Sequence, residues 1–392
     1  MRKKVNTHDI HGPIKATVIS GIDKISADQW NACSGLENPF VTHEFLSALE
    51  DSGSVCEDSG WLPQHLLIQD KTGEVLGAAP AYLKSHSFGE YVFDWGWAEA
   101  FERAGGKYYP KLQVAVPFTP VTGPRFLIRD TTDRELVKTA LAEGLIELAK
   151  ELHASSLHVT FCEQKEHEYL MGNGFLKRIG KQFHWHNRGY ETFEDFLSTL
   201  TSRKRKSVRK ERTTANQGIK IETLSGQELR EEHMEFFYEF YLNTIDRKWA
   251  HAYLNREFFS LLRERLANKI VLFLASKEKS PIAGALNFLG TNSIFGRNWG
   301  YSVQSPMLYF EMCFYRAIDY AIQHQLSKVE AGAQGPHKIS RGYLPSETYS
   351  AHWISHEGFR NAIDDYLKKE TSVTRHEMTL LERQMSPYRK DL

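Results

Sequence analysis

The chain has 392 residues, and its hydrophobic fraction of 41% and charged fraction of 25% are those of an ordinary globular protein. Lys and Arg together number 49, as do Asp and Glu, so the formal net charge is zero. This balance excludes a protein that coats nucleic acid through overall positive charge, and the length predicts about two to three domains.

The first half of the chain alternates predicted strands and helices. A turn at residues 71–74 joins two apolar runs into a predicted hairpin. A long stretch with apolar residues at helical spacing follows, with Leu136, Leu145 and Leu148 on its expected buried face. The predicted elements of this half are strands over 61–69, 75–83, 157–161 and 183–187 and a helix over 131–153.

The second half shows a similar order of helix, hairpin, strand, helix and strand. Its predicted helices cover 193–216 (one or two helices), 229–244, 257–266 and 308–325, and its strands cover 219–221, 270–275, 282–289, 293–301 and 329–331. We therefore predict an α/β (α+β) protein with a boundary near residues 188–200 and domains over 1–190 and 191–392. The shared element order suggests a structural duplication.

Targeting signals and metal motifs are not found in the sequence. The basic start has no apolar run behind it, and no apolar stretch approaches the ~18 residues of a membrane span. No CxxC pair or HExxH motif occurs, so we expect no metal and no disulfide framework. We expect a cytoplasmic protein with no bound cofactor.

A basic run, SRKRKSVRKER (202–212), is the strongest charge feature. At helical spacing Arg205, Arg209 and Arg212 share one face, with Lys210 beside them. The run is either a solvated helix face or a contact for phosphate or another anion. No aromatic residue interleaves it, so base recognition is not indicated.

An aromatic stretch, residues 91–126, is rich in Trp, Tyr, Gly and Pro. Trp95, Trp97 and Tyr108 are either the wall of a groove for sugar rings or an extended peptide, or the anchors of a core loop. Asp94 is among the polar residues close to them in the sequence.

Residues 296–343 contain the candidate chemistry of the second half. Glu330 follows an apolar strand start and precedes a glycine-rich turn, where it fits a general base, with His337 as an alternative. Lys338 and Arg341 fit the binding of an anionic donor or of a developing oxyanion. Cys313 in a nucleophilic role is the weaker alternative, because its place among Phe and Tyr in a helix is typical of a core thiol.

The sequence thus yields three groups of candidate site residues. The catalytic candidates are Glu330, His337 and Lys338; the substrate-binding candidates are Trp95, Trp97, Tyr108, Arg297, Trp299, Gln334, Arg341 and Tyr343; and the donor-binding candidates are Arg205, Arg209 and Lys210.

Several segments together resemble one known family. They are YYPKLQVAVPFTPVTG (108–123), QFHWHN (182–187), the basic run (202–212), GRNWG (296–300) and VEAGAQGPHKISRGY (329–343). With these segments the chain resembles the FemAB-like group of the GNAT acyltransferase superfamily, often described as peptidoglycan biosynthesis or recognition proteins, from about Asn38 to about Glu370.

The resemblance implies two tandem GNAT-like domains, each a mixed sheet flanked by helices, and acyl or aminoacyl transfer to an amine, as in a peptidoglycan precursor. It leaves acyl-CoA and aminoacyl-tRNA open as donors, and a tRNA-borne donor would suit the basic run. The acetyl-CoA enzymes of this superfamily carry a Q/R-x-x-G-x-G/A loop before a helix. Residues 297–302 match that loop in part, since Ser302 stands at the last position and the helix is expected only near Pro306.

Two other functions stay open beside the transferase. A binding module that keeps the fold would recognise glycan or peptide through Trp95 and Trp97, with no exposed acid near Glu330. An RNA-binding protein would use the basic run and show a steep salt dependence. The transferase hypothesis expects an open cleft between residues 332–341 and the strand end at Trp299.

Overall fold

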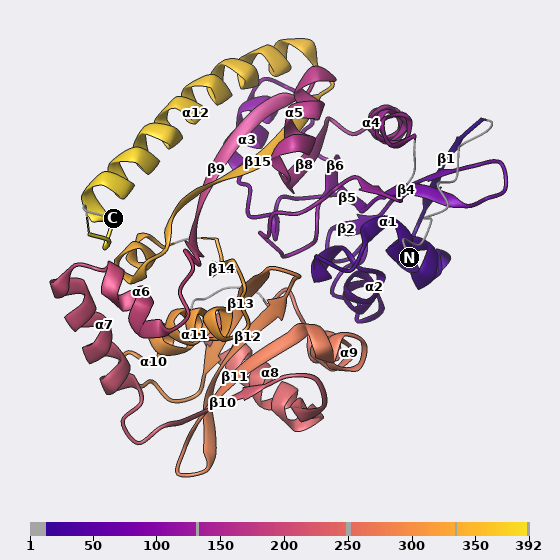
Figure 1. Ribbon diagram of the computed structural model, residues 1–392. Coiled ribbons are helices and arrows are strands. Elements are labelled where there is room, and N and C mark those ends of the chain that lie inside the picture. Colours follow the sequence, from indigo (N-terminus) through magenta and orange to yellow (C-terminus); the bar gives the residue numbers. More distant parts are fainter. Residues whose placement is uncertain (1–12, 131–132, 248–251, 334, 390–392) are drawn as a thin grey trace, which may run out of the picture. The chain divides into compact units, whose positions relative to one another are not determined.

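The computed structural model describes residues 13–130, 133–247, 252–333 and 335–389 (Figure 1). The chain forms two compact units: unit 1 comprises Met1–Gly180 and Thr348–Ser372, and unit 2 comprises Lys181–Glu347 and Val373–Leu392. Three elements contribute residues to both units, namely β9 (Leu176–His186), β15 (Leu344–Ile354) and α12 (Glu357–Met385).

Unit 1 contains two groups of paired strands. The order β1-β3-β4-β7 is antiparallel throughout, and in the order β15-β8-β6-β5-β2 the pair β6 and β8 is parallel. Its remaining strands are β1 (Lys15–Ile19), β2 (Trp61–Pro63), β3 (His65–Gln69), β4 (Val75–Ala79), β5 (Ala81–Lys84), β6 (Lys111–Val114), β7 (Leu127–Ile128) and β8 (Ser156–Cys162). Its helices are η1 (Ile22–Lys24), α1 (Ala27–Ser34), η2 (Pro39–Val41), α2 (His43–Asp51), α3 (Trp95–Arg103), α4 (Arg134–Glu151) and α5 (Gln164–Gly172).

The predicted hairpin of unit 1 is present, but each of its two strands is split. The chain breaks at Gln64 and at Pro80, so that β3 pairs with β4 while β2 pairs with β5. Proline has no N–H to donate to a strand ladder, which accounts for the break on the returning strand. The hairpin thereby supplies strands to both groups, which the alternation of its residues alone does not predict.

Helix α4 covers the sheet of β3 and β4 and matches the predicted helix, although one of the residues predicted to be buried is exposed. Val137, Leu141, Leu145 and Leu148 are buried, whereas Leu136 is 48% exposed. The face that contacts the sheet is therefore rotated from the face expected from the leucines.

Unit 2 is built on one mixed sheet in the order β10-β11-β12-β13-β14-β9. Neighbours are antiparallel except β13 and β14, which are parallel. The strands not yet named are β10 (Lys220–Leu224), β11 (Ile270–Lys277), β12 (Ser280–Leu289), β13 (Ser293–Tyr301) and β14 (Lys328–Glu330). The helices are α6 (Phe193–Thr199), α7 (Ser202–Ala215), η3 (Gly226–Glu228), α8 (Glu231–Asp246), α9 (Arg256–Leu266), η4 (Ala267–Lys269), α10 (Leu308–Phe310), η5 (Glu311–Tyr315), α11 (Arg316–Gln323) and η6 (Pro336–Arg341).

The two faces of this sheet are covered by different helices. Gly284 on β12 and Gly300 on β13 face α8, where Phe237 and Phe240 lie against them. Since side chains alternate along a strand, Trp299 points to the other face and packs with the core beneath η5 and α11. The helix and strand predictions for residues 219–331 are confirmed, whereas β15 and the 29-residue α12 were not foreseen.

Gly300 allows the closest approach of helix and sheet in unit 2. A Cβ atom at this position would overlap with the backbone of Phe240 and Tyr241, which cannot move aside as a side-chain end can. We predict that Gly300→Ala lowers the free energy of unfolding by about 3 kcal/mol, because overpacking against backbone forces the helix away. Urea unfolding measures this change.

Gly172 provides the matched control. It ends α5, and a Cβ there would meet no heavy atom within 4 Å. Gly172→Ala should leave stability unchanged or slightly higher. Equal stabilities of the two variants would contradict the packing assigned to Gly300.

Candidate functional site

The central strands of the unit 2 sheet diverge. β13 and β14 pair in parallel from Ser293 with Lys328 to Phe295 with Glu330, where β14 ends while β13 continues to Tyr301. At the same point β13 carries a bulge, because Gly296 lies opposite Asn287 and Asn298 opposite Leu286. The bulge inserts one extra residue and re-aims the strand. The divergence opens space beside the bulge.

A small cavity of about 80 Å³ occupies this space. Its lining residues are Ala285, Leu286, Asn287, Gly296, Arg297, Asn298, Trp299, Tyr309, Cys313 and Ala331. Pockets that bind whole small molecules usually measure about 300–1,000 Å³, so this cavity has room for only part of such a molecule. It contains two of the predicted substrate-binding residues, Arg297 and Trp299. None of the described residues 332–333 and 335–341 lines it, so the cleft expected between them and Trp299 is not seen in this cavity.

Glu330, the first catalytic candidate, is buried, with 3% of its surface exposed. Its carboxylate lies 2.5 Å from the Lys328 ammonium and 3.8 Å from Nε2 of His184. Burial lowers the pKa of His184 to about 4, a shift that Glu330 opposes and Lys328 reinforces. His184 is therefore neutral near pH 7, and Lys328 supplies the compensating charge. A role of Glu330 as base stays a prediction.

Lys338, another catalytic candidate, is also buried and donates a hydrogen bond from Nζ to the Gly332 carbonyl, 2.8 Å away. Burial lowers its pKa to about 8, and the Cys313 thiol, which lines the cavity, opposes that shift. Burial also raises the pKa of Cys313, as expected for a core thiol and not for a thiolate nucleophile. A cation close to the cavity lining is thus present at neutral pH.

Of the other predicted residues of this turn, Arg341 and Tyr343 serve the protein's own packing. His337 is exposed, and burial of its ring atoms lowers its pKa, with Arg341 and Lys338 adding to the effect. The Arg341 guanidinium pairs with Glu211, donates to the His337 carbonyl and stacks on a phenylalanine ring. Tyr343 is fully buried and donates to a backbone carbonyl. Gln334 lies outside the described residues.

Helix α7 carries the basic run, and its residues divide into two kinds. Arg209 is exposed and pairs with the exposed Glu194, and Lys210 is exposed and Arg205 half-buried. Arg212, expected on the same face, instead makes two hydrogen bonds of 3.0 Å to Glu311. Glu311 is fully buried, so this arginine holds α7 against η5. The exposed basic residues stay predictions for donor binding.

Arg212 and Arg209 therefore differ in what they contribute to stability. We predict that Arg212→Ala costs about 3 kcal/mol of unfolding free energy, because it leaves the buried Glu311 carboxylate with less compensation. Arg209→Ala should cost less than about 1 kcal/mol, because its ion pair is exposed. Thermal and urea unfolding measure both, and equal costs would contradict the structural role of Arg212.

The aromatic residues predicted in unit 1 occupy three environments. Trp95 is 41% exposed at the start of α3, Trp97 is buried two residues further on, and Tyr108 is fully buried. The Tyr108 hydroxyl donates to Oδ2 of Asp94 over 2.7 Å. Trp97 lines a separate groove in unit 1. Tyr108 contacts a polar cluster that the sequence analysis did not predict.

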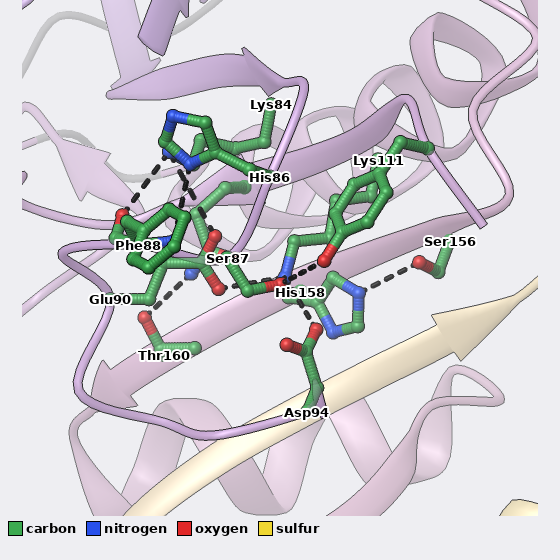
Figure 2. Close-up of polar contacts among 12 residues, drawn as sticks. Lys84, His86, Ser87, Phe88, Glu90, Asp94, Lys111, Ser156, His158 and Thr160 are labelled. Atoms are coloured by element: carbon green, nitrogen blue, oxygen red, sulfur yellow. Dashed lines mark hydrogen bonds and ion pairs between the residues drawn. The ribbon is translucent and has the colours of Figure 1, made fainter. Parts of the chain in front are cut away.

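That cluster is centred on Lys111, a fully buried lysine at the start of β6 (Figure 2). Its ammonium donates to Glu90 over 2.7 Å, to Ser87 over 2.8 Å and to Asp94. Burial tends to lower the pKa of Lys111, but the two carboxylates outweigh it and hold the pKa above its usual value. The sequence shows Lys111 and the acids of the loop before α3, but no pattern in it pairs them.

The pKa values of the two carboxylates in this cluster are shifted in opposite directions. Burial raises the pKa of Glu90 to about 7, against the pull of Lys111. Burial has the same tendency at Asp94, but the Lys111 ammonium prevails and holds that pKa well below its ordinary range. Lys84, stacked 3.6 Å from the Trp61 ring, has its pKa lowered by burial to about 7. Such opposed shifts around one cation are typical of functional sites and of structural ion networks alike.

Two buried histidines lie beside the cluster. Nδ1 of His158 and Nδ1 of His352 are 2.6 Å apart, and Nε2 of His158 is 2.7 Å from the Ser156 hydroxyl. Burial lowers the pKa of His158 to about 3 and that of His352 well below 6.5. Both rings are uncharged at neutral pH, so Nδ1 of one ring donates a hydrogen bond to Nδ1 of the other.

The neutral histidines predict a loss of stability in mild acid. Unfolded histidines take up protons below about pH 6.5, while the buried rings do not. The unfolded state is therefore stabilised relative to the folded state as pH falls. His158→Gln should reduce the slope of unfolding free energy against pH between 6.5 and 5 by up to about 1.4 kcal/mol per unit. Urea unfolding across this range measures it; His376→Gln, which changes an exposed histidine, should keep the wild-type slope. A wild-type slope in His158→Gln would contradict the burial effect.

Comparison with known proteins agrees with this fold. One family model, described as FemAB-like, peptidoglycan biosynthesis/recognition, matches residues 21–390. The chain belongs to this family. The resemblance seen in the sequence is thereby confirmed, and the description of the family relates it to peptidoglycan biosynthesis or recognition. No curated protein matches this FemAB-like chain.

Solved structures similar to the FemAB-like chain have low sequence identity to it. The crystal structure of FemX is 12% identical, with a TM-score of 0.54 over 89% of this chain and 100% of FemX. A tandem GNAT protein from the clavulanic acid biosynthesis pathway is 10% identical, with a TM-score of 0.45 over 88% of this chain and 99% of that protein. L-PGS from Bacillus licheniformis is 10% identical, with a TM-score of 0.49 over 91% and 99%. The predicted fold class, α/β with tandem GNAT-like units, is confirmed.

Two further kinds of feature are absent from the described residues. No three His, Cys, Asp or Glu side chains among them are grouped so that they could hold a metal ion. None of the helices in the described ranges is both long and apolar enough to cross a membrane.

Proposed function

We propose that this FemAB-like protein transfers an acyl or aminoacyl group to an amine of a peptidoglycan precursor, at the diverging ends of β13 and β14 in unit 2. The observation that supports this is the strand divergence itself, with its bulge and the cavity beside Trp299. The cavity accepts the reacting carbonyl, while the rest of the donor stays outside it. Acyl-CoA and aminoacyl-tRNA both remain proposals for that donor.

In this reaction the amine nitrogen attacks the carbonyl carbon, the carbonyl oxygen becomes an oxyanion, and the bond to the donor's oxygen or sulfur then breaks. The attacking nitrogen loses a proton on the way. The Lys338 ammonium belongs to η6, which packs against η5 with its cavity-lining Cys313, and it is suited to stabilise the oxyanion. The exposed His337, whose pKa is lowered, is suited to accept the proton.

Lys338→Met tests this assignment. The substitution removes the charge and keeps a long apolar stem, so the variant should fold. We predict that transfer falls about a hundredfold, as expected when one oxyanion donor is lost. In the wild type, the rate contribution of the ammonium should disappear as pH rises through about 8, where Lys338 loses its proton.

The measurement is transfer of a labelled acyl group from acyl-CoAs or aminoacyl-tRNA to peptidoglycan precursors. Lys220→Met, which changes an exposed lysine on β10, is the matched control and should keep the wild-type rate. If wild type transfers label and Lys338→Met does so equally well, Lys338 has no role in the chemistry. If no donor is used, the transferase proposal fails.

A binding protein without catalysis is the second candidate, and specific observations favour it. Glu330 is buried and ion-paired with Lys328, as that alternative expects. The cavity in unit 2 is small, whereas unit 1 holds a much larger aromatic groove. This alternative is supported if a cell-wall ligand raises the melting temperature and no transfer of label is observed.

A further inference from the structure

Unit 1 contains a groove that the proposed reaction does not use. Its volume is about 760 Å³, which lies within the range of small-molecule pockets. It lies between α3 with the loop that follows and the start of α12. Its lining residues are Phe93, Gly96, Trp97, Ala100, Phe101, Ala104, Gly105, Gly106, His356, Gly358, Phe359, Ala362, Ile363 and Tyr366.

Small residues keep the groove open along α3. Gly96, Ala100 and Ala104 recur every four residues, so they share one helix face and form a shallow strip. The eight residue steps from the first to the last span about 12 Å at the rise of an α-helix. The strip has the dimensions of an elongated ligand laid along the helix.

The groove is rigidly built. The Trp97 ring lies 5.0 Å from the His352 ring and 4.8 Å from the Arg178 guanidinium, which makes two 2.9 Å hydrogen bonds to Glu370. Phe101 stacks on Phe359 with ring centroids 4.4 Å apart. A pocket whose walls are fixed in this way loses little entropy when a ligand enters.

The chemistry of the lining selects the class of ligand. Three lining side chains carry polar atoms, namely Trp97, His356 and Tyr366. The Phe359 N–H donates to Nδ1 of His356, and the Tyr366 hydroxyl donates to Glu370. A sugar or nucleotide would bury hydroxyls or charges here with few partners, at a cost of several kcal/mol. An apolar chain meets no such cost.

Exposed aromatic side chains mark the rim. Phe93 is 54% exposed and Tyr366 is 49% exposed, and both line the groove. Trp95, the first residue of α3 and two residues after Phe93, is 41% exposed. Large apolar side chains gathered around an apolar hollow indicate a surface that is covered when a ligand is bound.

We propose that the α3–α12 groove of unit 1 binds the hydrocarbon chain of an amphiphilic ligand, either a fatty acyl or an isoprenoid chain. The groove holds the chain along Gly96, Ala100 and Ala104 against Trp97, and the ligand's polar end stays in solvent. This binding is independent of acyl transfer in unit 2, so failure of either proposal leaves the other intact.

The test is titration of the full-length protein with dansyl-labelled undecanoic acid, whose fluorescence rises in an apolar site. We expect saturable binding to the wild type. Ala100→Trp, which fills the strip from an exposed position, should weaken binding at least tenfold. Glu99→Trp adds the same side chain at a neighbouring residue outside the lining and should bind as wild type does.

Gly96→Leu is the second filling variant, because a Cβ there meets open space and the fold should tolerate it. Dodecanoic acid and farnesol as competitors distinguish acyl from isoprenoid chains, and displacement by either supports the proposal. Three results would overturn it: no saturable binding to the wild type, equal binding by Ala100→Trp and Glu99→Trp, or displacement by N-acetylglucosamine while neither hydrocarbon competes.

Discussion

The buried Lys111 ammonium is the constraint on which unit 1 depends. A lysine with no exposed surface is tolerated only if anionic partners replace the water it has lost, and Glu90 and Asp94 do so. Both acids belong to the loop between β5 and α3, so the ion network fixes this loop to β6. Asp94 also starts α3, because its carbonyl accepts hydrogen bonds from the first turn of the helix. The direction of α3, and with it the groove wall at Trp97, follows from the placement of one charge.

A similar rule operates in unit 2, where buried charge decides the place of the basic helix. Arg212 belongs to a run that resembles an anion-binding surface, yet it neutralises the buried Glu311 of η5. Glu211, the acid beside it, pairs with Arg341 and accepts a hydrogen bond from Tyr315. Helix α7 therefore has an inner face that binds the protein itself and an outer face with Arg209 and Lys210 that is available to other molecules.

The sequence predicts features that depend on local periodicity. Strands β11 to β13 and helices α8 and α9 follow from alternation and helical spacing. The sequence also pointed to the strand end at Trp299, beside which the small cavity lies, and binding of a ligand there stays a prediction. Features that depend on distant residues were not predictable in this way. The contact between His158 and His352 joins positions 194 residues apart, and the Lys111 cluster joins two segments through charges that have no sequence pattern. The groove requires α12, which neither motif nor resemblance indicated.

The path of the chain has a consequence for biosynthesis. Unit 1 includes residues 348–372, and strand β15 pairs there with β8 through Ala351 and His352. A ribosome releases the chain from its amino end onward, so the first 180 residues emerge long before the strand and helix that complete their unit. Unit 1 must wait, partly assembled and with one edge of β8 unpaired, until residues 348–372 have been translated. Chaperones that shield exposed strand edges would have their greatest effect on this protein during that interval.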